Sequence, residues 1–123
     1  MTDNIVKIDT EQQLVFGWAS VVFDQDGPVV DRQGDVIDAS ELEKAAYAYV
    51  LESRVGGEMH RTTGVAKLVE SIVFTKQKQE ALGIDLGKTG WWVGFKVTDP
   101  DVWAKVKKGE LRSFSIHGKA RRV

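Results

Sequence analysis

The chain has 123 residues, 42% of them hydrophobic, and a formal net charge of −1 at pH 7. This length suits one compact domain over residues 1–123, and four Trp and five Phe residues can fill its core. The balanced charge argues against nucleic acid or an acidic membrane surface as the main partner, and the absence of Cys excludes disulfides, thiolate metal sites and cysteine nucleophiles.

The first part of the chain predicts strands. It begins with polar residues, with no signal-peptide pattern, and no segment has the roughly 20 apolar residues of a membrane helix, so we expect a soluble cytoplasmic protein. Residues 5–8 suit a short strand, 10–12 a turn and 13–23 a long strand. Both faces of the long strand are apolar, which predicts that it is covered on both sides or closed in a barrel, with a bulge or sharp bend at Gly17. Residues 24–28 have the composition of a turn.

The clearest helix begins at Ser40. Ser40 and Glu43 have the spacing of a capping box, and the helix should end before Gly56. Apolar residues follow at helical spacing, namely Leu42, Ala45, Ala46, Tyr49 and Val50. Residues 58–63 then form a polar loop that contains His60, and residues 64–75 suit a strand.

The second half continues the mixed pattern. Residues 76–82 fit either a helical turn or a loop, and residues 91–97 predict a strand with Trp91, Val93, Phe95 and Val97 on one face. Asp99 and Pro100 mark the start of a second helix, and Gly109 marks its end. Residues 111–117 suit a last strand. Strands with two inserted helices indicate an α+β fold.

Several motifs resemble known sites without meeting their requirements. The segment GIDLGKT at 83–89 has three residues between its glycines where a phosphate-binding loop has four, and it precedes a strand, so we interpret it as a hairpin turn. The aspartates at 24–27 lack the spacing of a calcium loop, and the two His residues lack that of a zinc site. The basic residues at 119–122 suit a solvated terminus better than a nucleic-acid site.

The last predicted strand places Ser113, Ser115 and His117 on one face. A serine nucleophile needs a base, and only His60 and His117 are unambiguous candidates near pH 7. His117 lies about 7 Å from Ser115 at the rise of a strand, which is too far for a direct hydrogen bond. His60, in its loop, can fold over the strand. The alternative is a polar outer face with no chemistry.

Stretches along nearly the whole chain resemble the XkdF-like branch of the phage prohead (capsid maturation) serine proteases. They are VKIDTEQQLVFGWASVV, VVDRQGDVIDASELEKAAYAYV, GGEMHRTTG, VESIVFT and GWWVGFKVTDPDVWAKVKKGELRSFSIHGKA. This family is similar in fold to the herpesvirus assemblins. The resemblance therefore implies a small, mainly antiparallel β-barrel with two or more flanking helices, and a homodimer by analogy.

The resemblance also implies catalytic residues. Phe114-Ser115-Ile116 stands where the family has its nucleophile motif, so Ser115 is the implied nucleophile and His60 the implied general base. In related proteases a third residue lies well downstream of the serine, and this chain has no counterpart. His117 is the first candidate for that role, followed by four acidic residues, namely Asp31, Asp35, Glu58 and Glu70.

The resemblance implies a serine endopeptidase that cleaves scaffold and capsid proteins inside the phage prohead, in the cytoplasm of a bacterial host. No cofactor or metal is implied, and no membrane or specific nucleic acid is an expected partner. A second reading is a catalytically inactive protease-fold domain that serves in capsid or portal assembly. A nucleic-acid-binding role would depend on the basic C-terminal residues alone.

Overall fold

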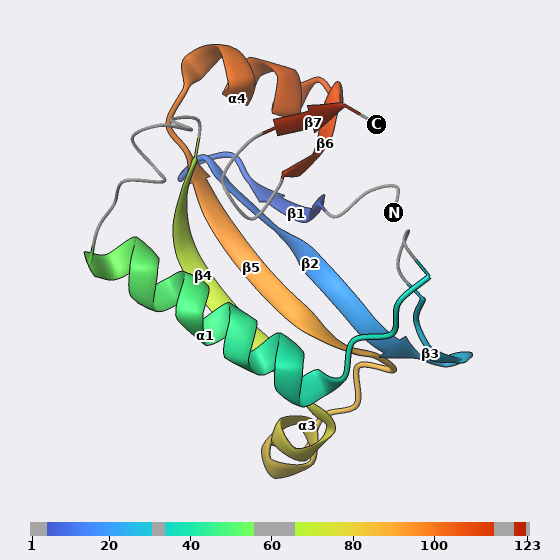
Figure 1. Ribbon diagram of the computed structural model, residues 1–123. Helices are drawn as coiled ribbons and strands as arrows, with labels where there is room; N and C mark the ends of the chain where they lie inside the picture. The colour runs from blue at the N-terminus through green and yellow to red at the C-terminus, as the bar shows by residue number, and fades with distance from the viewer. Residues whose placement is uncertain (1–4, 31–33, 56–65, 115–119, 123) are drawn as a thin grey trace.

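The computed structural model describes residues 5–30, 34–55, 66–114 and 120–122 and shows an α+β fold (Figure 1). Its main sheet is antiparallel, with strand order β1-β2-β5-β4. These strands are β1 (Ile5–Asp9), β2 (Leu14–Asp24), β5 (Thr89–Val97) and β4 (Ala66–Phe74), and the short β3 (Gly27–Pro28) pairs with the end of β2. The strands predicted at 5–8, 13–23, 64–75 and 91–97 are confirmed.

Three helices and a second small sheet complete the described structure. The helices are α1 (Ala39–Val55), α3 (Lys76–Leu82) and α4 (Pro100–Lys107). The strands β6 (Leu111–Phe114) and β7 (Ala120–Arg122) pair with each other, so the last predicted strand is confirmed as far as Phe114. Helix α1 packs against β4 and β5, whereas α4 and β6 lie near the other end of β5 and near β1 (Figure 1).

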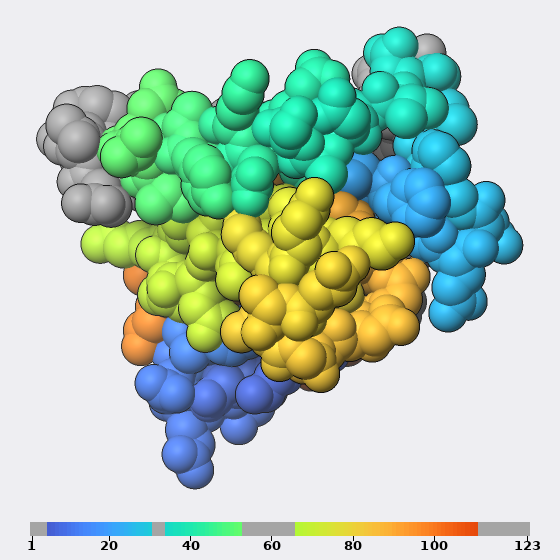
Figure 2. Space-filling model, turned by 90° about the horizontal axis from the view of Figure 1, so that it is seen from below, coloured from blue at the N-terminus to red at the C-terminus, as the bar shows by residue number. Residues whose placement is uncertain are grey.

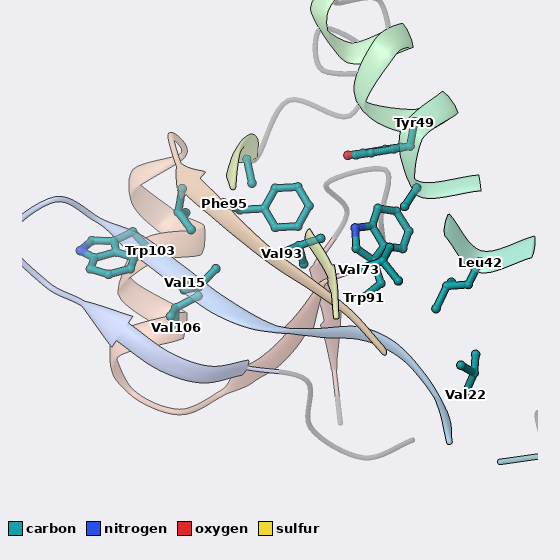
Figure 3. Packing of buried hydrophobic residues seen from close by; sticks show 13 residues of the cluster. Val15, Val22, Leu42, Tyr49, Val73, Trp91, Val93, Phe95, Trp103 and Val106 are labelled. Atoms are coloured by element: carbon teal, nitrogen blue, oxygen red, sulfur yellow. The ribbon is translucent and has the colours of Figure 1, made fainter. Parts of the chain in front are cut away.

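The core lies between α1, α4 and one face of the sheet (Figure 3). Trp91, Val93, Phe95 and Val97 of β5 are all buried on this face, as their alternation predicts. The ring of Tyr49 meets Trp91 edge-on, with centroids 5.5 Å apart. Burial of these large apolar groups is the main source of the fold's stability. Helix α1 contributes Leu42, Ala46 and Tyr49 to the core, whereas Ala45, which was predicted to join them, is exposed.

The opposite face of the sheet carries an aromatic cluster, which consists of Phe16, Trp18, Phe74 and Trp92. The rings of Trp18 and Trp92 lie 5.4 Å apart, and Phe16 and Phe74 contact this pair from either side. The prediction of a barrel is wrong for the described residues, because β1 and β4 are separate edges of an open sheet. The second apolar face of β2 is instead satisfied by aromatic packing across strands of the sheet itself.

A register shift lies at Gly17, where a bulge or sharp bend was predicted. Gly17 pairs with Ile5 and the adjacent residue, Phe16, pairs with Lys7, so the extra residue is Val6 of β1 rather than a residue of β2. Toward β5, Gly17 pairs with Val93, and the register shifts further along, between Trp18 and Ser20.

The capping residue of helix α1 lies two residues before the predicted one, and the helix itself begins at Ala39. The Asp38 carboxylate accepts hydrogen bonds from the Glu41 backbone N–H (3.0 Å) and the Ser40 hydroxyl (2.7 Å), so Asp38 is the capping residue in place of Ser40. Both hydrogen bonds lower the pKa of Asp38, and that of the Glu41 N–H has the larger effect. In α4 the predicted cap is confirmed, because Asp99 accepts from the N–H groups of Asp101 and Val102.

Residues 76–82 form the helix α3. Thr75 caps its start by accepting from the Lys78 N–H, and Gly83 ends it in the left-handed conformation (φ 70°). The buried side-chain amide of Gln79 fixes residues 83–89, which follow the helix. Its NH₂ group donates hydrogen bonds to the backbone carbonyls of Phe74 and Lys88, and its oxygen accepts one from the N–H of Leu86. Residues 83–89 therefore connect a helix to a strand, and their interpretation as a hairpin turn was wrong.

Candidate functional site

The predicted catalytic residues lie outside the described residues. Ser115 and His117 fall between β6 and β7, and His60 falls between α1 and β4. Their roles therefore stay predictions, and the structure bears on them only through the elements that flank them.

The residues on either side of the Ser115 segment pair with each other. Ser113 pairs with Arg121 and Phe114 pairs with Ala120, directly before and after residues 115–119. Strand β6 contacts both β1 and α4, and α4 begins just after the end of β5 (Figure 1).

The strand that follows the His60 segment begins at the same end of β5. Its first residue, Ala66, pairs with Val97, the last residue of β5. Ala66 and Val97 are almost fully buried, in one cluster with Trp103 of α4. On the other side the segment follows α1, which runs from the β3 end of the sheet toward this end (Figure 1). The start of β4 and the start of α4, which leads into β6, thus lie at the same end of β5.

The two described acidic candidates for a third catalytic residue lie elsewhere. Asp35 belongs to the segment before α1, next to the Val30–Val36 bridge at the β3 end of the sheet (Figure 1). Glu70 lies on the sheet face opposite α1, where the Trp92 indole N–H donates to its carboxylate at 3.4 Å. Neither residue adjoins the elements that flank Ser115. Asp31 and Glu58 lie outside the described residues, as His117 does.

A charged contact joins α1 to α3. The Lys78 ammonium contacts the Glu43 carboxylate at 2.7 Å, and it also donates to the Tyr47 hydroxyl and the Val73 carbonyl. Hydrogen bonds from Lys78 and then Tyr47 lower the pKa of Glu43. Desolvation alone would lower the pKa of Lys78, but the hydrogen bonds with Glu43 and Tyr47 outweigh it and raise that pKa. This cluster is satisfied internally and fixes the two helices together.

Two surface recesses lie at the β3 end of the sheet, and Phe23 lines both of them. The larger, of about 490 Å³, is lined mainly by apolar residues of β2, β3 and the segment before α1. The smaller, of about 320 Å³, lies between the end of β2, α3 and the 84–88 segment. Both share Phe23, Lys76 and Thr89. The sequence analysis missed this region because its residues come from four separate parts of the chain.

The described residues show no cluster of His, Cys, Asp or Glu that would hold a metal ion. Among the helices described here, none is both long and apolar enough to cross a membrane.

Comparison with known proteins identifies the family. Residues 2–123 match the family described as "Putative phage serine protease XkdF". The chain belongs to this family. Two curated proteins of Bacillus subtilis (strain 168) are similar to it. "Uncharacterized protein YqbD" is 32% identical over 97% of this chain and 35% of its own length, and "Phage-like element PBSX protein XkdF" is 33% identical over 89% of this chain and 38% of its own length.

The resemblance to the XkdF-like family is therefore confirmed. The chain spans little more than a third of the length of these two relatives. No solved structure matches the chain significantly, so the kinship with herpesvirus assemblins stays a prediction.

Proposed function

We propose that this chain is a serine endopeptidase domain of phage head maturation, with Ser115 as nucleophile and His60 as general base. The family match over residues 2–123 supports the peptidase class. One structural observation carries the assignment of the residues. The start of β4, which follows the His60 segment, and the start of α4, which leads into β6 and Ser115, lie at the same end of β5, as a shared active site would require.

The proposed reaction is acyl transfer to serine. His60 removes the proton of the Ser115 hydroxyl as its oxygen attacks the peptide carbonyl, and it then gives that proton to the leaving amine. Water, activated by the same imidazole, next cleaves the acyl-serine and releases the new carboxylate. His117 is the proposed third group, which orients His60. Backbone N–H groups of the β6–β7 connection are the proposed donors to the oxyanion.

The proposed substrates are scaffold and capsid proteins, cleaved inside the immature head. One relative is named "Phage-like element PBSX protein XkdF", and this similarity supports a phage setting. Because the chain spans little more than a third of the length of these relatives, this proposal concerns residues 1–123 alone.

Co-expression with the scaffold and major capsid proteins of the same phage element tests the proposal. We expect the wild-type chain to cut these proteins into defined fragments, which mass spectrometry detects. Ser115→Ala and His60→Gln should each abolish this cleavage. Ser113→Ala is the matched control, because it removes a neighbouring hydroxyl and should keep cleavage. Fragments of unchanged yield with Ser115→Ala would refute the catalytic assignment. Normal head assembly without any cleavage would favour the inactive assembly domain.

A further inference from the structure

We infer that the two recesses beside Phe23 form a docking site for an extended peptide of a partner protein, in which a bulky apolar side chain lies close to an Arg or Lys. This inference does not depend on the proposed peptidase chemistry. The site lies at the β3 end of the sheet and includes the start of α1, whereas the His60 segment follows the other end of that helix and the Ser115 segment lies between β6 and β7 (Figure 1).

The larger recess supplies the apolar part of the site. Val22, Pro28, Val36, Ile37 and Ala39 line it together with Phe23. Phe23 and Val36 remain 50% and 56% exposed, and Ile37 is also exposed. Exposed large apolar groups that gather around one hollow are typical of interaction sites rather than of ordinary surface. The charged residues Lys76 and Asp38 at its border balance each other, so the apolar wall decides what binds here.

The smaller recess has a different character, because three carboxylates line it. These are Asp24, Glu80 and Asp85. Asp24 and Asp85 each use one oxygen to accept an N–H of their own turn, at 2.8 and 2.9 Å. Among the described residues, none of the three carboxylates forms an ion pair. Their charge is therefore available to a cationic ligand.

The two lysines of the smaller recess only partly offset these carboxylates. Lys88 extends its ammonium over the ring of Trp18, 5.5 Å from the centroid, and so contacts the aromatic cluster. Lys76, which lines both recesses, is then the lysine left to offset the three carboxylates. Phe23 and Ile84 also line the smaller recess and offer apolar surface to the stem of a long cationic side chain. An Arg or Lys thus complements this recess in both charge and shape.

An extended peptide explains why two unlike recesses adjoin. They share Phe23, Lys76 and Thr89, so one ligand fills both only if it carries an apolar and a cationic group on one side. In an extended chain, side chains two residues apart point to the same side and lie roughly 7 Å from each other. Figure 2 looks onto this end of the molecule, where α3, the start of α1 and the β2–β3 region meet at the surface.

The test begins with a selection from random 12-residue peptides displayed on phage, with the wild-type chain as bait. We expect enrichment of peptides in which a large apolar residue stands within two positions of Arg or Lys. The most enriched peptide, labelled with fluorescein, is then titrated by fluorescence anisotropy. Val36→Asp should weaken its binding about tenfold or more, because it places a charge in the apolar recess. Val69→Asp is the control, since Val69 is 51% exposed on β4.

A second set of variants tests the charge argument without disturbing the turns. Asp24→Asn, Glu80→Gln and Asp85→Asn together remove three charges and keep the turn acceptors. We expect roughly tenfold weaker binding and a flatter dependence on salt. The matched control neutralises three exposed glutamates elsewhere, namely Glu11, Glu52 and Glu110.

Several results would overturn the inference. One is a selection in which the wild-type bait enriches no peptide more than a bait that carries Val36→Asp. Another is a selection that enriches acidic peptides. Equal binding by the neutralised variant and its control would also reject it. A wild-type dimer in analytical ultracentrifugation that Phe23→Ser converts to monomer would assign the recesses to a second copy of the chain instead. Far-UV circular dichroism verifies that each variant is folded.

Discussion

Two glycines of β5 offer a sharp test of the packing between strands. A Cβ atom added at Gly90 would lie 2.5 Å from the backbone carbonyl oxygen of Ser20 and 3.1 Å from both the Trp18 ring and the Val21 Cα. A Cβ atom at Gly94 would meet only side-chain atoms, the nearest at 3.2 Å. The two substitutions are chemically identical, but only the first meets backbone atoms that are held in the sheet.

The expected magnitudes follow from these contacts. Gly→Ala reduces the entropy of the unfolded chain and stabilises a protein by roughly 0.4–1 kcal/mol where the new methyl group fits. Overpacking costs roughly 1–3 kcal/mol, and a backbone atom at 2.5 Å places Gly90→Ala at the upper end. We therefore expect Gly90→Ala to lose about 2 kcal/mol of unfolding free energy. For Gly94→Ala the two effects nearly cancel, and the change should stay within about 0.5 kcal/mol.

Urea unfolding followed by far-UV circular dichroism measures both values. The difference in unfolding free energy between the two variants is the most informative value, because the entropy effect of Gly→Ala on the unfolded chain is common to both and cancels. A Gly94→Ala protein as unstable as Gly90→Ala would refute the reasoning, and so would a Gly90→Ala protein as stable as the wild type.

Three further predictions concern hydrogen bonds. Lys78 lowers the pKa of Glu43, so the stability from this pair is present above the unfolded pKa of Glu43 and is lost as the pH falls through its lowered folded pKa. Glu43→Gln should cost about 0.5 kcal/mol at pH 7 in urea unfolding and almost nothing below that pKa. Gln79→Leu leaves three backbone groups unpaired and should cost about 3 kcal/mol, whereas Gln77→Leu should change stability little. Asp99→Ala removes the cap of α4 and should lower the unfolding free energy by about 1 kcal/mol.

The sequence predicted the elements whose signals are local. The alternation of Trp91, Val93 and Phe95 identified a strand with one buried face, and Asp99 with Pro100 identified the start of a helix. Such signals need only neighbouring residues, which the sequence provides directly.

The wrong predictions depended on tertiary contacts. Two apolar faces on β2 are compatible with a closed barrel and equally with an open sheet whose aromatic side chains cover one another. Helix α3 was ambiguous because its buried residue is polar, since Gln79 is fixed by hydrogen bonds rather than by apolar packing. Asp38 and Ser40 are both good capping residues, and their order in the chain did not decide between them.

The candidate sites also differ in how far the sequence could predict them. The roles of Ser115 and His60 came from a family resemblance, and they stay predictions. The recesses beside Phe23 are assembled from β2, the segment before α1, α3 and the start of β5. No local pattern joins these four segments, so only the folded chain reveals that they form one surface.

The most direct test of the central claim is reaction with a biotinylated fluorophosphonate, which modifies activated serines without knowledge of the substrate. The proposal predicts one adduct, located on Ser115 by tandem mass spectrometry, in the wild-type and Ser113→Ala proteins. His60→Gln should reduce the labelling rate by at least about a hundredfold, because the base would be lost. An adduct on another serine, or labelling of Ser115 at the same rate without His60, would contradict the proposed nucleophile and base.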